Sequence, residues 1–246
     1  MAIHPDYAPL LDDIRNHSPD NYDDAVFQHP MDFYRKRVAM IGAKGYDLVL
    51  DAGHGFGQWS VVLAENNQRV IGIDHNQPRY ECSKIIKEHF RAENFEPHLD
   101  SLYDAEKYVE PGMVDLIWCW SVVMFVDRSK LLPIFANLLR KDGILILGAV
   151  NTPSRWAYKI YKGAKDGVRN RNFYKSCLKG MFGLNRDVGS NAYNFAAAGK
   201  IGEQYGFKLD ATGRDGCIAR HAEPCLPFEA DVPERFQNIE LVYIKK

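Results

Sequence analysis

Short apolar runs alternate with helical segments between residues 47 and 150, and this alternation limits the folds that the chain can adopt. The runs are rich in Val, Ile and Leu, as buried strands are, and they occupy residues 47–53, 69–74, 95–99, 114–120 and 143–150. Helical periodicity is found at 57–67, 78–91 and 129–140. Strands separated by helices form parallel sheets with right-handed crossovers. The pattern predicts an α/β fold with a doubly wound, mostly parallel sheet and helices on both faces.

The remaining segments complete this expected architecture. Two further strands, at 207–212 and 238–246, bring the sheet to seven, and 196–207 reads as a helix running into the first of them. A turn is expected at the KDG sequence, residues 141–143. We predict one domain, 1–246, divided into an N-terminal helical segment (1–43), a cofactor-binding core (44–152), a helical substrate cap inserted after the fifth strand (153–190) and a C-terminal helix with strands (191–246).

Composition sets broad limits on class and location. A chain of 246 residues that is 46% hydrophobic can bury a large core without disulfides or metals. Its net charge of −1 does not indicate nucleic acid as a partner, and its five cysteines include no CxxC pair. We find no signal peptide, no apolar run long enough to cross a membrane and no carboxylate cluster with metal-ligand spacing. A cytoplasmic protein with reduced thiols and no metal is expected.

A glycine-rich motif, DAGHGFG at residues 51–57, closes the first strand and opens a helix. Glycines in such a loop let the backbone approach a ligand closely. Asp74 ends the next strand, where a carboxylate can accept hydrogen bonds from ribose hydroxyls. A dinucleotide motif that starts at Gly53 and Gly55 would need glycine at 58, where this chain has Gln58. The spacing therefore argues against a dinucleotide.

The DxGxGxG pattern together with Asp74 resembles motif I and the acidic ribose loop of the class I S-adenosylmethionine-dependent methyltransferases. The resemblance covers residues 47 to about 150 and resumes near 195. It implies a methyltransferase whose cofactor is S-adenosylmethionine and whose product is S-adenosylhomocysteine. The cofactor-binding residues that it implies are Tyr34, Arg37, Asp51, Gly53, Gly55, Asp74, His75, Asp100, Ser101, Leu102 and Ser121.

Roles for these residues follow from the same resemblance. Asp51 would orient the glycine loop and the amino acid end of the ligand, and Asp74 would hold the ribose. His75 and the turn at 100–102 would contact the adenine. The alternatives are that His75 is a surface residue and that Asp100 is a helix cap. Ser121 would lie near the methyl group. Tyr34 and Arg37, on the N-terminal helix, could reach the carboxylate of the ligand.

The chain departs from the family after the fourth strand, where many relatives have histidines and this sequence has Val122–Val126. This departure removes the commonest candidate for a general base and leaves an apolar wall that includes Phe125. Asp127 and His221 are the remaining catalytic candidates. A lone histidine in a loop is more often a surface residue.

The expected cap is strongly basic. Between residues 155 and 187 nine Lys or Arg residues face two Asp residues, and aromatic residues are interleaved with them. Trp156, Tyr158 and Tyr161 are the substrate-contacting candidates here, together with Phe125. The cap can be an amphipathic lid on the core, a site for an anionic substrate such as a phosphorylated sugar, or a contact with an anionic membrane that carries a lipid-linked substrate. RNA is a further reading, but no recognised RNA-binding module accompanies the patch.

We therefore predict methyl transfer to a small-molecule acceptor. O-methylation of a sugar, glycan or secondary metabolite is favoured, and the acceptor can be anionic. The alternatives are an N-methyltransferase, an RNA or protein methyltransferase, and a non-catalytic module that binds S-adenosylmethionine. The chain lacks an Asn-Pro-Pro-Tyr sequence after the fourth strand, which argues against the amide and exocyclic-amine classes that use it.

Overall fold

A computed structural model describes residues 3–17, 23–182, 200, 202–221 and 232–246. The chain divides into two compact units. Unit 1 comprises Met1–Ile117 with Ala219–Glu223, and unit 2 comprises Trp118–Ile218 with Pro224–Lys246. The boundary falls inside strand β4, Val114–Trp120, so this strand contributes residues to both units.

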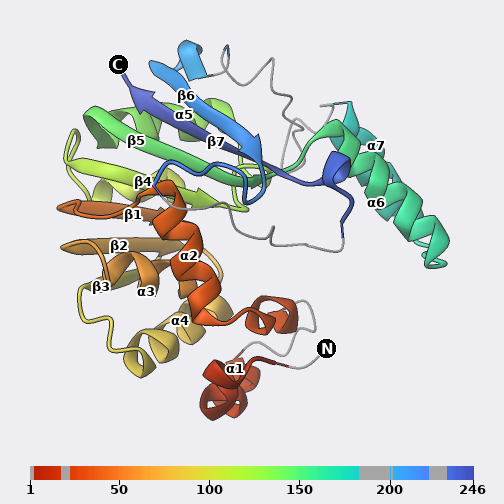
Figure 1. Ribbon diagram of the computed structural model, residues 1–246, viewed down its shortest axis with the longest axis horizontal. Coiled ribbons are helices and arrows are strands. Elements are labelled where there is room, and N and C mark those ends of the chain that lie inside the picture. Colours follow the sequence, from red (N-terminus) through yellow and green to blue (C-terminus); the bar gives the residue numbers. More distant parts are fainter. Residues whose placement is uncertain (1–2, 18–22, 183–199, 201, 222–231) are drawn as a thin grey trace. The chain divides into compact units, whose positions relative to one another are not determined.

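Seven strands lie in one sheet within the described ranges, in the order β3-β2-β1-β4-β5-β7-β6 (Figure 1). In addition to β4 they are β1 Leu48–Ala52, β2 Arg69–Asp74, β3 Phe95–Leu99, β5 Leu139–Val150, β6 Phe207–Arg214 and β7 Ile239–Lys245. In unit 1, β2 runs parallel to both β1 and β3. In unit 2, β7 runs antiparallel to both β5 and β6. The predicted α/β fold with a seven-stranded, mostly parallel sheet is confirmed.

The strands of unit 1 are buried because their branched aliphatic side chains leave water. Val49 and Leu50 of β1 and Ile71 of β2 have no exposed surface, and Leu50 is the register partner of Ile71. Helix α3, Gln58–Ala64, follows β1, and helix α4, Gln77–His89, follows β2. Because neighbouring parallel strands end at one edge of the sheet, the loops after β1 and β2 lie side by side.

Helix α3 is shorter than the predicted 57–67 because two asparagine side chains end it. Asn66 Nδ2 donates to Val62 O at 3.1 Å, and Asn67 Nδ2 donates to Leu63 O at 2.7 Å. These amides bond to carbonyl groups of the last turn, where an α-helix leaves its acceptors without intrahelical partners.

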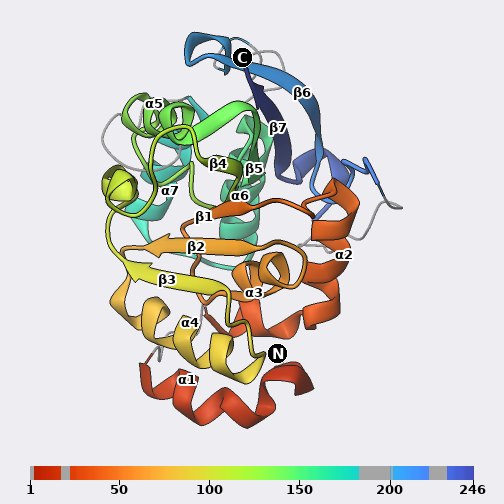
Figure 2. The same cartoon turned by 90° about the vertical axis from the view of Figure 1, so that its left-hand side faces the viewer.

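The N-terminal segment is helical, as predicted. It contains the 3₁₀ helices η1 (Pro5–Leu10) and η2 (Asp23–Gln28) and the α-helices α1 (Leu11–His17) and α2 (Met31–Ile41). Helix α1 lies against α4 (Figure 2). The N-terminal segment therefore packs onto the layer that covers β1 to β3.

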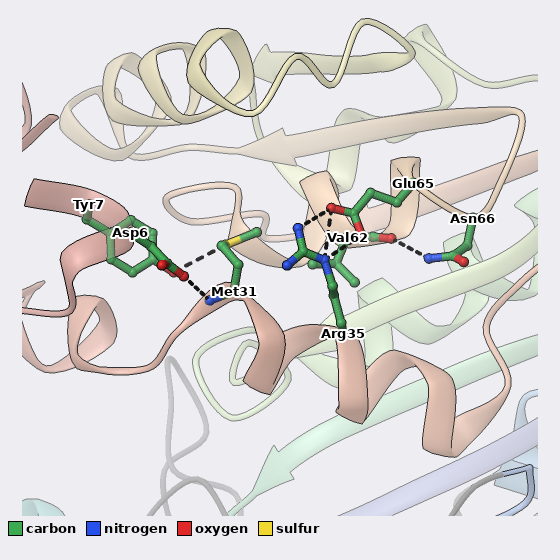
Figure 3. Close-up of polar contacts among 7 residues, drawn as sticks. All are labelled: Asp6, Tyr7, Met31, Arg35, Val62, Glu65 and Asn66. Atoms are coloured by element: carbon green, nitrogen blue, oxygen red, sulfur yellow. Dashed lines mark hydrogen bonds and ion pairs between the residues drawn. The ribbon is translucent and has the colours of Figure 1, made fainter. Parts of the chain in front are cut away.

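Within unit 1, polar contacts hold this segment together and join it to α3 (Figure 3). Asp6 accepts a hydrogen bond from Met31 N at 2.8 Å, and the hydroxyl of Tyr7 donates to Met31 Sδ at 3.2 Å. Arg35 of α2 forms a bidentate pair with Glu65, with its shortest N–O distance at 2.7 Å. These contacts join η1, α2 and the end of α3.

Strand β5 begins earlier than predicted. Helix α5, Arg128–Leu138, runs directly into β5 at Leu139, whereas the sequence predicted a turn at 141–143 and a strand from Gly143. Asp142 takes a left-handed φ of 62° within the strand in place of the expected turn. Asp tolerates a left-handed φ better than most residues do, because its short polar side chain can form local hydrogen bonds. The strand therefore continues through Asp142 and does not turn there.

The expected cap region contains two helices, α6 (Pro153–Lys165) and α7 (Arg171–Met181), while residues 183–190 of it lie outside the described residues. Of the predicted helix at 196–207, residues 200 and 202–204 are helical, and 196–199 and 201 also lie outside the described residues. Within the described ranges, no helix has the length and apolar character that crossing a membrane requires.

Candidate functional site

The glycine loop at residues 53–57 has a backbone that only glycine adopts easily. Gly53, Gly55 and Gly57 have φ values of 81°, 55° and 92°. A Cβ added to Gly55 would meet no atom within 4 Å, so one side of the loop is open. A Cβ on Gly57 would lie 3.2 Å from Ser83 Cβ. Gly57 therefore serves packing, whereas Gly55 leaves room for a ligand next to the backbone.

Asp74, expected to hold the ribose, also closes the loop. One carboxylate oxygen accepts from Gly55 N at 2.9 Å, and the other accepts from Asn76 N at 2.9 Å. Its side chain is only 6% exposed. The end of β2 thus holds the glycine loop after β1 through one carboxylate. Each oxygen keeps a further lone pair for another donor.

Asp51, the first residue of the motif, lies at the end of β1 and is 1% exposed. Ser60 Oγ donates to its Oδ2 at 2.5 Å. Burial raises the pKa of Asp51 to about 7, because the ionised form loses its hydration; the hydrogen bond from Ser60 lowers the pKa, and the charge of Asp74 raises it further. A cationic group bound beside Asp51 would favour the ionised form.

This raised pKa predicts a pH-dependent stability. An acid whose pKa is higher in the folded than in the unfolded state contributes stability that falls as pH rises between the two values. Replacing Asp51 with Asn should therefore stabilise the protein by an amount that grows from about pH 4 to pH 7 and reaches at most about 4 kcal/mol. Urea unfolding of both proteins across this range measures it. A difference that does not change with pH would contradict the assignment.

Two loop residues that sequence reasoning missed are His54 and Phe56. The His54 ring is 2% exposed and packs edge-on against Phe95 at 5.8 Å. Burial lowers the pKa of His54, so the ring favours its neutral form. Phe56 packs against Phe27 at 5.0 Å. The only available signal was the presence of two large rings between the glycines.

The N-terminal segment reaches the glycine loop through Phe27, not through the residues that we predicted. Tyr34 is 1% exposed, and its hydroxyl donates to Val26 O at 3.0 Å. Arg37 has no exposed surface. Both side chains are buried in the protein, and their contact with the ligand carboxylate stays a prediction.

The turn after β3 joins the same edge of unit 1. Asp100 N donates to Asp74 O at 3.1 Å, which places the ends of β2 and β3 together. The carboxylate of Asp100 accepts from Ser101 N at 2.7 Å, Tyr108 OH at 2.9 Å and Lys107 Nζ at 3.1 Å. The hydrogen bonds from Ser101, Lys107 and Tyr108 lower the pKa of Asp100, in that order of effect.

The other expected adenine contacts differ in exposure. The His75 side chain is 88% exposed, whereas Leu102 is 8% exposed. Ser101 Oγ accepts from Tyr103 N at 3.2 Å and so begins the 3₁₀ helix η3, Leu102–Lys107. Unit 1 thus brings together the predicted cofactor residues from 51 to 102. Their contact with a cofactor stays a prediction.

His221 does not lie at this edge. Its backbone N–H donates to Met40 O at 3.1 Å, and a Cβ on Gly42 would lie 2.0 Å from the His221 ring. Gly42 ends helix α2, ahead of the start of β1, which is the opposite end of the strand from the glycine loop. His221 therefore lies at the end of β1 that is opposite to the glycine loop, which argues against the predicted catalytic role.

Asp127 has a structural role in unit 2. Its carboxylate accepts from Ser129 N at 3.0 Å and Ser129 Oγ at 2.6 Å, and so caps helix α5. The side-chain hydrogen bond from Ser129 is the main cause that lowers the pKa of Asp127. A carboxylate held ionised in this way is a weak base, so the prediction of Asp127 as general base is not supported.

Other candidates in unit 2 lie after β4 and β5. Ser121 follows β4 with a left-handed φ of 59°, and its N–H donates to Gly148 O at 3.0 Å. A serine seldom adopts such a φ unless its surroundings hold it, and strained residues concentrate at functional sites. Phe125 is 56% exposed. The predicted role of Ser121 beside the methyl group remains a prediction.

Of the substrate candidates on α6, two are packed against other residues and one is exposed. Trp156 is 7% exposed, and the Tyr158 ring stacks on Phe236 at 5.0 Å, whereas Tyr161 is 63% exposed. Lys159 Nζ lies 4.3 Å from the centre of the Trp156 ring and donates to Asn151 Oδ1 at 3.3 Å. Lys159 and Asn151 were not among the predicted site residues, although Lys159 belonged to the basic cap.

Residues 49–143 match the protein family described as "Methyltransferase domain". This segment begins in β1, ends in β5 and includes the glycine loop, Asp74 and Asp100. The chain carries a methyltransferase domain. The family that the sequence motif indicated is thereby confirmed for this segment, and with it the prediction of an enzyme of the methyltransferase class.

Solved methyltransferase structures share the fold of this chain. Magnesium protoporphyrin IX methyltransferase from Synechocystis PCC 6803, with bound S-adenosylhomocysteine, is 18% identical; the match covers 98% of this chain and 97% of that one, with a TM-score of 0.59. Geranyl diphosphate C-methyltransferase from Streptomyces coelicolor A3(2), in complex with Mg²⁺, geranyl diphosphate and S-adenosylhomocysteine, is 13% identical, with 91% and 83% covered and a TM-score of 0.60. At these identities the likeness shows the fold. No curated protein matches this chain by sequence.

Proposed function

We propose that this methyltransferase transfers the methyl group of S-adenosylmethionine to a small-molecule acceptor. The observation that carries the proposal is the glycine loop of unit 1. Gly55 leaves open space beside the backbone, and the carboxylates of Asp51 and Asp74 stand at the ends of two neighbouring strands. The match of residues 49–143 to the methyltransferase domain supports it, as do the two structural neighbours named with S-adenosylhomocysteine.

The residues at this edge fit the cofactor group by group. An ionised Asp51 would bind the α-ammonium group, and the remaining lone pairs of Asp74 would accept from ribose hydroxyls. Asp100 would accept from the exocyclic amine of adenine, and the open side of Gly55 would admit the ligand beside the backbone. When bound, S-adenosylmethionine supplies an electrophilic methyl group on a sulfonium. The chain contributes the binding and orientation of both reactants.

In-line displacement at a methyl group depends mainly on holding the acceptor in near-attack geometry. We propose that neither predicted base transfers the proton, since Asp127 caps α5 and His221 lies near the end of α2, before β1. An acceptor oxygen that is already ionised, such as a carboxylate, would need no base. We therefore propose O-methylation of an anionic metabolite or sugar derivative, with N-methylation as the alternative.

The proposed anionic character of the acceptor is supported by Lys159 in the middle of α6. Lys159 places its ammonium group beside Asn151, which directly follows β5 and is 2% exposed. A cation held against a buried amide and an aromatic ring is well placed to meet a phosphate or carboxylate. One structural neighbour is named for a diphosphate. A lipid-linked acceptor is part of the proposal, and the cytoplasmic location stays a prediction.

Calorimetric titration with S-adenosylhomocysteine tests the function. We expect micromolar binding with one site per chain and no heat from NADH, because the loop lacks the third glycine of the dinucleotide motif. A screen of anionic and neutral acceptors with isotopically labelled S-adenosylmethionine then follows. No binding, or binding of NADH instead, would refute the proposal. Binding without turnover on any acceptor would favour a non-catalytic module.

A further inference from the structure

Helices α6 and α7 form an ordered hairpin, residues 153–182, which lies entirely within unit 2 (Figure 1). Gly163 of α6 packs against the Phe173 ring of α7, where a Cβ would lie 2.7 Å from Cε1. Tyr174 OH donates to Val168 O at 2.8 Å, which ties α7 to the connecting turn. Cys177 is 1% exposed on the inner side. The hairpin therefore presents a defined outer surface.

The hairpin carries large apolar side chains in contact with water. Tyr161, Val168, Leu178 and Phe182 are 63%, 38%, 45% and 67% exposed. They are half of the exposed large apolar residues in the described part of the chain, although the hairpin is only 30 residues long. Single exposed apolar residues are ordinary, but a local concentration of them indicates a binding surface.

The hairpin is also basic. From residue 155 to 182 there are eight Lys or Arg residues and one acidic residue, Asp166, which pairs with Lys162 at 3.1 Å. Six of the basic side chains are exposed: Lys162, Lys165, Arg169, Arg171, Lys175 and Lys179. Helical spacing places Arg171, Lys175, Leu178 and Phe182 along one face of α7. Apolar and cationic groups thus share one face.

We propose that the α6–α7 hairpin docks on the surface of an anionic lipid bilayer, an interaction beyond the proposed methyl transfer. Lipid phosphates would pair with the basic groups, while Leu178, Phe182 and Tyr161 would enter the boundary between headgroups and acyl chains. A nucleic acid would match the charge but leave the aliphatic groups in water. A second copy of this surface would be repelled by its like charge.

Vesicle co-sedimentation of the full chain tests the docking. We compare phosphatidylcholine vesicles that contain phosphatidylglycerol with vesicles of phosphatidylcholine alone. We expect at least about tenfold stronger binding to the anionic vesicles, reduced by added salt, because each basic residue near an anionic surface adds to the attraction. Equal binding to both vesicles, or no binding to either, would overturn the proposal.

Two variants separate the apolar from the electrostatic contribution. Leu178→Ser with Phe182→Ser removes exposed apolar surface, and Lys175→Glu with Lys179→Glu reverses two charges. Both should lose most of the vesicle binding. The matched controls are Met113→Ser, which is 57% exposed in unit 1, and Lys208→Glu, which is exposed on β6; both should bind as the unchanged protein does.

The outcomes distinguish lipid from other partners. Binding that is lost on charge reversal but kept in the serine variant would indicate a general polyanion site, such as one for nucleic acid, and would overturn the lipid proposal. Calorimetric binding of S-adenosylhomocysteine and the thermal unfolding midpoint should be unchanged in all four variants. Failure of docking can therefore be told apart from failure of the proposed function and from misfolding.

Discussion

Replacing Asp74 with Ala should weaken the binding of S-adenosylhomocysteine about a hundredfold, a loss of about 2.7 kcal/mol. The carboxylate holds Gly55 N and Asn76 N, each at 2.9 Å, and would also accept from the ribose. Hydrogen bonds to a charged group contribute about 1.5–3 kcal/mol each. The substitution removes the ligand contact and releases the loop that borders the open side of Gly55.

Calorimetry of the variant and two controls measures this effect. Asp47→Ala removes an exposed carboxylate just before β1, at the far end of the strand from the loop, and should leave binding unchanged. Asp74→Asn keeps one acceptor oxygen and should lose less affinity than Asp74→Ala. Equal affinity of Asp74→Ala and the unchanged protein would show that the ribose site lies elsewhere.

Replacing Gly148 with Ala should destabilise the fold by about 2–3 kcal/mol, because it overpacks the interior of unit 2. A Cβ at this position would lie 1.9 Å from Cε3 of Trp120. The indole ring of Trp120 cannot move away freely, since it stacks on Trp118 with centroids 5.4 Å apart and planes at 13°, and Trp120 is 7% exposed. A shift of β5 would also disturb the hydrogen bond from Ser121 N to Gly148 O.

Urea unfolding at neutral pH measures this loss. Gly213→Ala in β6 is the matched control, because its Cβ would lie 3.0 Å from Ile218 Cγ1 and a small shift of a flexible side chain relieves that contact. In the double variant Gly148→Ala with Trp120→Leu, the smaller residue makes room for the methyl group. The two changes should then cost less together than the sum of their separate costs. If the losses of stability from the two substitutions simply add, the Trp120 ring is not what restricts the size of the side chain at position 148.

The base for the transferred proton was the least predictable part of the site. Asp127 and His221 were chosen because each follows a predicted strand and carries a titratable group. The structure assigns Asp127 to the cap of α5 and His221 to the end of α2, because each is held by neighbours that the sequence does not place. Ser60 shows the reverse case. It was not among the predicted site residues, yet its hydroxyl donates a hydrogen bond to the buried Asp51 at 2.5 Å.

Local pattern was sufficient for the strands, for most helices and for the glycine loop. Runs of branched residues, the positions of Gly53, Gly55 and Gly57, and the carboxylates at strand ends act over a few residues, so the sequence alone determined them. Adjacent parallel strands then place Asp51, Asp74 and Asp100 at one edge. The short α3 and the early start of β5 differ from the predictions only in where these elements begin or end. Side-chain amides determine the end of α3, and one left-handed residue keeps the start of β5 extended.

The tertiary structure alone decided which side chains remain available to a ligand. The sequence predicted that Tyr34 and Arg37 could reach the carboxylate of the ligand, but packing buries both side chains. Phe27 instead contacts the loop through Phe56. Likewise, only the folded hairpin shows that Leu178 and Phe182 stay in water beside Lys175. Burial of a side chain depends on packing against residues that are distant in the sequence. The periodicity of one segment does not reveal which distant residues pack against it.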